Sequence, residues 1–300
     1  MALAQTTLSC ATPWLKGLHL DQDAAAGVRF CPAAEDTGIV FVRADLPGDP
    51  EVRCVLDNLR SMPRWTSLAE GGHWVHHTEH VLAALAFCRI DNARVEMDCD
   101  RLPMMPGGSC APFVEAILCA GVRQQDAPRQ VFTLQKPFVH LDNQTTTGEQ
   151  LEEPSIRNGR YILGFPSDRL KVSSIFHWPQ LESLPVGIAE FEMSDEGVDD
   201  EVVQSRSYLV DSEREQVRDL LGPIRDHVLH LSPGCSTDLA IEAARHKIVD
   251  FVGDMMVLGR PLVGHFAIFR AGHRIHHDVA RQLYCEGIHS GRSGLQVCEK

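Results

Sequence analysis

The sequence has no continuous apolar run of about 20 residues, the length that a membrane-spanning helix needs. Its first residues also lack a basic segment followed by an apolar one, which is the pattern of a secretory signal peptide. We therefore expect a cytoplasmic protein without a transmembrane segment.

Positive charge is also scarce. The chain has 28 Lys and Arg against 41 Asp and Glu, and its formal net charge is −13. Such a chain repels the phosphate backbone of nucleic acids and anionic membranes unless a local basic patch offsets the charge. The sequence contains no such patch, so we expect no nucleic-acid partner.

None of the ten cysteines belongs to a Cys-x-x-Cys pair. Scattered cysteines in a chain of this size without a secretory signal are typical of small buried hydrophobic residues. We therefore interpret them as mostly buried and expect no thiolate ligands for a metal.

Length and composition favour two modest domains, because 300 residues, 44% of them apolar, can form two separate cores. In the first half, alternating or β-branched runs predict strands, and helix formers follow Thr78, a residue suited to capping. The predicted strands are 27–31, 37–43 and 93–97, and the predicted helices are 78–88 and 112–120. This order is typical of an α+β unit.

The same order of elements begins again after the polar, proline-containing stretch 123–129, which we interpret as a domain boundary. The predicted strands of the second half are 131–134, 137–140 and 172–178, and the predicted helices are 201–221 and 241–258. We therefore divide the chain into two α+β domains, 1–126 and 127–300.

The strongest chemical signal lies in the last predicted helix. His246, Asp250 and Asp254 recur at i, i+4 and i+8 and so share one face. Two carboxylates four residues apart repel each other unless a cation neutralises them, and Lys247 cannot neutralise both. A metal ion or an imidazolium would supply the missing positive charge. Gly253 on the same side weakens the helix, a cost that is tolerable where something approaches the backbone closely.

A catalytic zinc site usually has three protein ligands and one position open for water. The helix supplies two, so the third must come from elsewhere in the chain. The best candidate is His80, because it stands beside Glu79 at a helix start, where a carboxylate can take a proton from a metal-bound water.

Other interpretations of these histidines remain open. A His-x-x-x-Asp pattern on a helix is most often an exposed polar face. The run His73, His76, His77 and His80 fits either a chance chelating cluster or a solvated loop, and the sequence has no His-Glu-x-x-His motif. His265 lies in an apolar, strand-like run and favours a core histidine over a ligand.

Several segments, in order along most of the chain, resemble the UDP-3-O-acyl-N-acetylglucosamine deacetylases of lipid A biosynthesis. In the first half they are Gly17-Leu18-His19, Pro32-Ala33-Ala34, Thr37 to Phe41, Glu79-His80, Ile90-Asp91-Asn92 and Pro112-Phe113. In the second half they are Arg206-Ser207-Tyr208, Arg245-His246-Lys247 with Asp250 and Gly253-Asp254, and Gly272-His273.

The resemblance implies a metal site and a base. His80, His246 and Asp250 would bind Zn²⁺, with Fe²⁺ as an alternative for the same ligands. Glu79 would be the base that activates the metal-bound water.

The resemblance also implies roles for the remaining site residues. A protonated His273, oriented by Asp254, would stabilise the oxyanion and protonate the leaving amine. Ser207 would help to hold the oxyanion, and Lys247 would contact the substrate. By the same resemblance, Tyr208 and Arg270 fall among the substrate-binding positions.

The implied fold is α+β, with two similar domains that each pack a β-sheet on a pair of helices. The active site lies between the helix layers, and an apolar passage for the acyl chain belongs to the second domain. The implied reaction is hydrolysis of the 2-acetamido group of a UDP-linked acylated amino sugar, which releases acetate. We expect the enzyme to act as a monomer.

Three departures from the family pattern concern substrate contacts. Where the family has an acidic loop, this chain has Met105-Pro106-Gly107-Gly108-Ser109. Where the family has Thr-Phe-Gly-Phe, this chain has Ser207-Tyr208-Leu209-Val210. Arg270 replaces a lysine of the family. The stretch before His246 is also shorter than usual. Two alternatives therefore stay open: a divergent zinc amidohydrolase acting on another N-acyl sugar, and a catalytically silent metal-binding relative.

Overall fold

A computed structural model describes most of the chain. The described residues are 3–19, 24–62, 64–142, 159–178, 183–195, 197–211, 228–289 and 295–297. Their architecture is mixed α+β, as the sequence predicts. No helix among them is both long enough and apolar enough to cross a lipid bilayer.

The first half forms three groups of strands and two helices. Its elements are β1 (Ala4–Leu8), β2 (Leu15–Leu18), β3 (Ala25–Pro32), β4 (Ile39–Arg43), β5 (Glu51–Arg53), β6 (Leu59–Ser61), β7 (Thr66–Glu70), β8 (His73–His76), α1 (Glu79–Phe87), β9 (Ala93–Met97), α2 (Ala111–Ala120) and β10 (Val122–Pro128). The main sheet has the order β2-β3-β9-β4-β5, β6-β7-β8 form an antiparallel meander, and β1 pairs with β10.

The second half forms a larger sheet with its own helices. Its elements are β11 (Gln130–Thr133), β12 (Phe138–Asp142), β13 (Arg160–Phe165), β14 (Leu170–Phe176), β15 (Gly187–Glu192), α3 (Asp200–Val203), β16 (Tyr208–Val210), β17 (Leu229–Leu231), α5 (Thr237–Met255), β18 (Leu262–Phe269), α6 (His273–His289) and β19 (Leu295–Val297). In the seven-stranded sheet β18 is central, with β13, β14 and β11 as partners.

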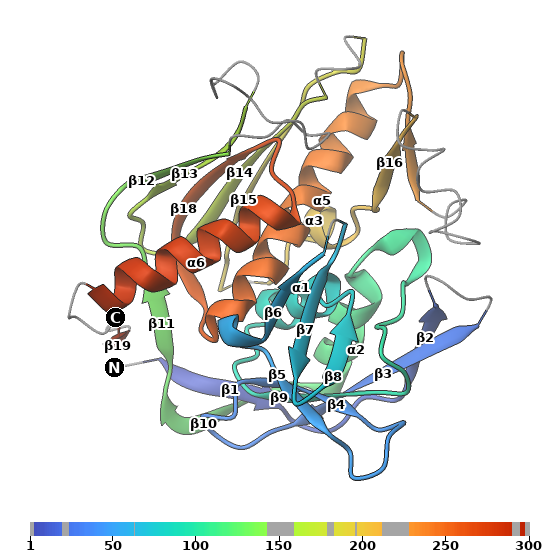
Figure 1. The fold of residues 1–300 in the computed structure, drawn as a ribbon, viewed down its shortest axis with the longest axis vertical. Coiled ribbons are helices and arrows are strands. Elements are labelled where there is room, and N and C mark those ends of the chain that lie inside the picture. The colour runs from blue at the N-terminus through green and yellow to red at the C-terminus, as the bar shows by residue number, and fades with distance from the viewer. Residues whose placement is uncertain are drawn as a thin grey trace.

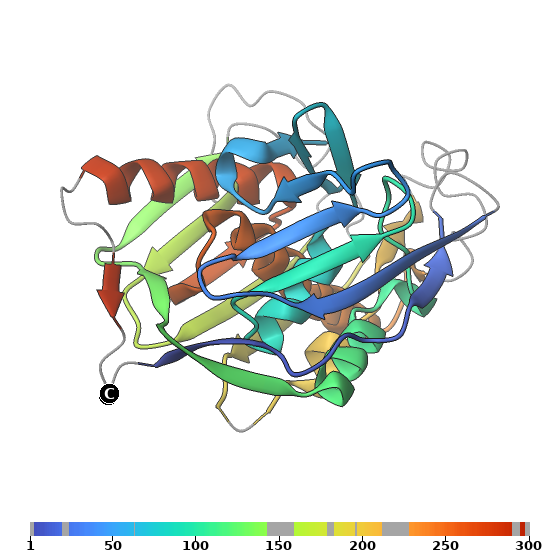
Figure 2. The ribbon, with the colours of Figure 1, turned by 90° about the horizontal axis from the view of Figure 1, so that it is seen from below.

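The helices lie between the two large sheets, as Figure 1 shows. In Figure 2 the sheet of the first half faces the viewer, with α1 behind it. Helix α1 contacts α5, and α5 in turn packs on β14 and β15. The consecutive residues Val81 to Leu85 of α1 are all buried, so that the helix is covered on every side. A helix that is apolar all round belongs in such a core, where each buried leucine stabilises the fold by about 2 kcal/mol.

Most predicted elements are confirmed within a few residues, but helix 201–221 is wrong. Helix α3 ends at Val203, and Tyr208–Val210 is a strand that pairs in parallel with β17. The backbone N–H of Ser207 donates to the Gly107 carbonyl instead of an i−4 carbonyl, which ends helical pairing there. Residues 212–221 lie outside the described residues.

Two smaller predictions are also wrong. Thr78 makes no side-chain cap, because its hydroxyl donates to the Thr66 carbonyl. Among the nine described cysteines, all free, only Cys54, Cys88 and Cys110 are buried. The stretch 123–129, which we interpret as a domain boundary, lies largely in β10, where it pairs with β1, and the division into two domains stays a prediction.

Candidate active site

One face of α5 carries the polar residues of the site. Ser236 caps the helix by accepting a hydrogen bond from the Leu239 N–H. His246, Asp250 and Asp254 are all buried on the helix, so the face deduced from their spacing is not an exposed polar face.

Helix α1 approaches this face at Gly253. A Cβ atom there would lie 2.0 Å from the carbonyl oxygen of Glu79, closer than real atoms come. The glycine therefore lets the two backbones touch, and the contact brings the first turn of α1, with Glu79 and His80, against α5.

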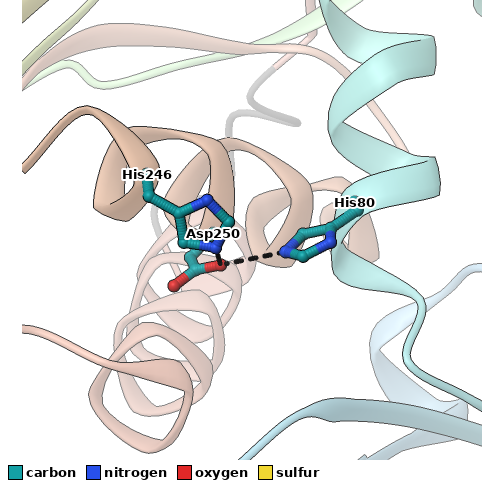
Figure 3. A group of neighbouring side chains, drawn as sticks. All are labelled: His80, His246 and Asp250. Atoms are coloured by element: carbon teal, nitrogen blue, oxygen red, sulfur yellow. Dashed lines mark ion pairs between the residues drawn. The ribbon is translucent and has the colours of Figure 1, made fainter. Parts of the chain in front are cut away.

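His80, His246 and Asp250 point toward one another from the two helices (Figure 3). Asp250 Oδ1 lies 3.4 Å from His246 Nε2 and 3.6 Å from His80 Nε2. Ligands on one zinc ion, at bonds of about 2.1 Å and tetrahedral angles, lie about 3.4 Å apart. The three donor atoms therefore fit a metal ion of this kind, and all lie within 4.8 Å of one another.

The protonation states of two donors suit a cation. His246 Nδ1 lies 3.2 Å from the Ser205 carbonyl, to which it donates, so Nε2 keeps its lone pair. Burial lowers the pKa of His246 to about 4, which keeps the ring neutral. Burial opposes the charge of Asp250, but Lys247 and the neighbouring histidines together outweigh burial and hold the pKa of that carboxyl well below its usual range.

Lys247 forms a hydrogen bond with the carboxylate of the three-donor group. Its Nζ donates to Asp250 Oδ2 at 2.9 Å and lies 5.1 Å from the centre of the Tyr208 ring. Burial works against its charge, but Asp250 and Tyr208 raise the pKa of Lys247, so the ammonium persists. As the spacing implied, Lys247 pairs with only one of the two carboxylates, that of Asp250, and Asp254 has other partners.

Glu79 is a buried carboxylate beside the three donors. Its Oε2 accepts the Thr66 N–H at 3.0 Å. Burial raises the pKa of Glu79, since the charged form loses hydration. A carboxylate with a raised pKa is a stronger base than an exposed one, which suits proton abstraction.

His273, at the start of α6, pairs with Asp254. Its Nδ1 lies 2.8 Å from Asp254 Oδ2. Burial disfavours the imidazolium, but the carboxylates of Asp254 and Asp250 outweigh burial and raise the pKa of His273 to about 9. The site thus combines a buried carboxylate, which can act as a base, with a histidine that is protonated at neutral pH, a pair that can cleave an amide.

Ser207 and Tyr208 lie at the edge of the three donors. The Ser207 hydroxyl is 3.1 Å from His246 Nε2 and 3.4 Å from the Gly108 carbonyl. The Tyr208 ring packs edge-on against His246, with 6.3 Å between ring centroids.

Arg270 follows β18 and is buried. Its guanidinium donates to His177 Nδ1 and to the Gly159 carbonyl, and it stacks on Phe269. None of these contacts is to His80, His246 or Asp250, and its role toward the substrate stays a prediction.

The other histidines take separate places. His73 and His76 lie on β8 and His77 is buried after it, with His76 bonded to Ser67. Neither interpretation of the run from His73 to His80 therefore holds, because only His80 joins the donor group. His265 is half-buried and bonded to Ser173, away from the donors, so it is not a ligand.

Sequence reasoning missed three buried residues that complete the surroundings of Asp254. Thr66 donates to Asp254 Oδ1 at 2.5 Å, and His276 Nδ1 lies 2.7 Å from Oδ2. His277 bonds the Thr66 hydroxyl at 2.8 Å. The spacing of His273, His276 and His277, i, i+3 and i+4, was the available signal for a shared helix face.

A separate cavity of about 340 Å³ lies between the two halves, toward the C-terminal ends of α1 and α5. Val252, Met255 and Met256 contribute to its apolar wall, and Arg89 and Arg129 also line it. None of the site residues described above lines it, so we place the chemistry at the donor group instead.

Comparison with known proteins gives consistent matches along the chain. Residues 5–285 match the family model described as LpxC, UDP-3-O-acyl N-acetylglycosamine deacetylase. A UDP-3-O-acyl-N-acetylglucosamine deacetylase from Anaeromyxobacter sp. is 32% identical over 293 residues, which cover 91% of this chain and 86% of that protein. The protein of the same name from Myxococcus xanthus is 29% identical, with 90% and 83% covered. That from Thermosynechococcus vestitus is 28% identical, with 94% and 95% covered.

Proposed function

This chain belongs to the family of UDP-3-O-acyl N-acetylglycosamine deacetylases, and from that premise we propose that it hydrolyses the 2-acetamido group of UDP-3-O-acyl-N-acetylglucosamine in lipid A biosynthesis. The products are the free amine and acetate. The observation that carries the proposal is the group of His80, His246 and Asp250, with Glu79 and the His273–Asp254 pair beside it.

His80, His246 and Asp250 would hold the metal ion. Two imidazoles and one carboxylate suit Zn²⁺, and Fe²⁺ accepts the same ligands. A bound ion of this kind polarises the amide carbonyl and lowers the pKa of a water molecule. Lys247 keeps the carboxylate of Asp250 charged and oriented for that purpose.

Glu79 and His273 would move the protons. Glu79, as the buried carboxylate, accepts the proton of the water that attacks the amide carbonyl. His273, held in its charged form by Asp254, stabilises the negative charge on the carbonyl oxygen and then donates its proton to the leaving amine. Ser207 supplies a hydroxyl donor beside the same oxygen.

The substrate would extend from this point along both halves of the chain. We assign Lys247, Tyr208 and Arg270 to substrate contacts, and the acyl-chain passage to the second half. We treat 1–126 and 127–300 as the two domains, of which the first supplies Glu79 and His80 and the second supplies the rest. The enzyme would work as a monomer in the cytoplasm.

The test is acetate release from UDP-3-O-acyl-N-acetylglucosamine by metal-replete protein, metal-free protein and Glu79→Gln. We expect release only from the metal-replete wild type. Glu115→Gln makes the same chemical change at an exposed position of α2 and should keep full activity.

Absence of release from metal-replete wild type would contradict the proposal. Turnover of a non-nucleotide N-acyl sugar in its place would identify a divergent amidohydrolase. Tight metal binding without turnover of either substrate would identify a silent relative.

A further inference from the structure

Thr66 is the first residue of β7, and all its polar atoms are engaged although it is fully buried. Its N–H donates to Glu79 Oε2 at 3.0 Å, and its carbonyl accepts from the N–H and hydroxyl of Thr78. Its hydroxyl lies 2.5 Å from Asp254 Oδ1 and 2.8 Å from His277 Nε2. One residue thus touches the partner of His273 and the carboxylate of Glu79.

The direction of these hydrogen bonds follows from donor counting. A charged Asp254 can only accept hydrogen bonds, so the Thr66 hydroxyl uses its single O–H to donate a hydrogen bond to Asp254. The same hydroxyl must then accept from His277, which places the proton of that ring on Nε2. His277 Nδ1 is left as an acceptor, and it lies 2.9 Å from the Ser61 hydroxyl. Arg281 donates to the Ser61 hydroxyl at 3.2 Å, so every hydrogen bond in this series is donated in the direction from the surface toward Asp254.

His276 gives Asp254 a further donor from α6. Its Nδ1 lies 2.7 Å from Asp254 Oδ2, beside the bond from His273. Its Nε2 is buried without a hydrogen-bond partner in the described part of the chain, and the ring meets the edge of Phe251. A ring with one bonded and one unbonded nitrogen in an apolar wall is neutral, with its proton on Nδ1.

These contacts come from both halves of the molecule. Thr66 belongs to the β6-β7-β8 meander of the first half, whereas Asp254 and His277 belong to α5 and α6. Figure 1 shows α6 running past β6, and β6 and α6 are in contact.

We propose that Thr66 is a positioning residue that holds Glu79 and the His273–Asp254 pair in register across the two halves, and that His277 and Ser61 fix the direction of its hydroxyl. His276 is the second positioning residue and holds the other oxygen of the carboxylate. The proposal rests on the proposed function for its catalytic consequence, but the hydrogen-bond directions can be tested without turnover.

The first experiment compares Thr66→Val with Thr66→Ser in the metal-replete enzyme. Valine keeps the shape and the backbone N–H but removes the hydroxyl, so we expect kcat to fall about 10- to 100-fold with KM unchanged. Serine restores the hydroxyl and should recover most of kcat. Equal losses in both variants, or wild-type kcat in Thr66→Val, would overturn the proposal.

Thr7→Val is the matched structural control. Thr7 is also buried, and its hydroxyl donates to the Asn92 carbonyl at 2.7 Å, away from the site. We expect this variant to lose thermal stability and to keep kcat. A fall in kcat equal to that of Thr66→Val would mean that general loosening explains both results.

The second experiment reads the ring nitrogens of His276 and His277 directly, by nitrogen NMR of wild-type protein with labelled histidine. We expect the proton of His277 on Nε2 and that of His276 on Nδ1. A proton on His277 Nδ1 would reverse the chain and overturn the proposal. Because this measurement needs no substrate, its failure differs from failure of the deacetylase assignment, which only the activity assay reports.

Discussion

Gly253 on α5 faces the backbone carbonyl of Glu79 on α1 with no room for a side chain, since a Cβ would lie 2.0 Å from that oxygen. The carbonyl is part of the residue that we propose as base, and the next residue, His80, is one of the three donors. The distance between α1 and α5 at the site therefore depends on the absence of a side chain at Gly253.

Gly253→Ala should push the helices apart. We expect a loss of stability of about 1–3 kcal/mol from overpacking, together with weaker metal binding, because His80 moves away from Asp250. Thermal unfolding and metal titration measure the two effects. Gly272→Ala is the control, because a Cβ at that position meets nothing within 4 Å. Normal metal affinity in Gly253→Ala would show that the contact does not set the donor spacing.

Removal of any single donor should remove the metal. His80→Ala and His246→Ala each leave two donors, and Asp250→Asn replaces the charged carboxylate with a neutral amide. We expect each variant to lose its metal on dialysis against a chelator that the wild type resists. Asp250→Asn should also destabilise the fold, because Lys247 would keep a buried charge without its partner. Metal analysis and thermal unfolding are the measurements.

His265→Ala is the matched control for the donor variants. His265 bonds Ser173 on the second sheet and lies outside the donor group, so this variant should keep its metal. Metal retention by any of the three donor variants would mean that the ion binds elsewhere.

The helices of the site could be predicted because local rules govern them. The spacing of His246, Asp250 and Asp254 places them on one face wherever the chain is helical, and the structure keeps that phase. Helix 201–221 was wrong because its end depends on contacts far along the chain. Ser207 is bonded to Gly107, and Tyr208 pairs with Leu229.

The contact of Thr66 with Asp254 could not be predicted for the same reason. Thr66 and Asp254 are 188 positions apart, and nothing in the local sequence of Thr66 indicates a buried carboxylate as its partner. Charge balance did predict that Asp254 needs a cationic partner, and the imidazolium of His273 is that partner. Whether the second carboxylate would face a metal or an imidazolium depends on how the helices cross.

Arg270 should behave first as a structural residue. Arg270→Lys loses the forked contacts to His177 and to the Gly159 carbonyl, so we expect a cost of about 1–3 kcal/mol and a lower Tm. Arg169→Lys, at an exposed pair with Glu192, is the control and should leave Tm unchanged. A raised KM with an unchanged Tm would instead assign Arg270 to substrate binding alone.

The pH dependence should follow His273. The groups that face it are Glu79 of α1, Asp250 and Asp254 of α5, and His276 and His277 of its own helix. The carboxylates outweigh burial and raise the pKa of His273 to about 9. The pair with Asp254 therefore stabilises the fold fully below the unfolded pKa of about 6.5, and this contribution disappears as pH rises through about 9. As the acid, His273 should keep kcat high up to the same pH, above which the rate falls.

Asp254→Asn tests the cause of that limit. Without the carboxylate, only Asp250 and Glu79 oppose the effect of burial, so the pKa of His273 falls from its wild-type value and the fall in kcat should begin at lower pH, with a smaller maximum. Asp278→Asn changes an acid on α6, the helix of His273, that pairs with Arg274 and Arg281, and it should leave the profile in place. The profile is measured as kcat against pH with metal content checked at each pH. If kcat falls at the same pH in the wild type and in Asp254→Asn, another group sets the basic limit, because this substitution removes the charge that we expect to raise the pKa of His273.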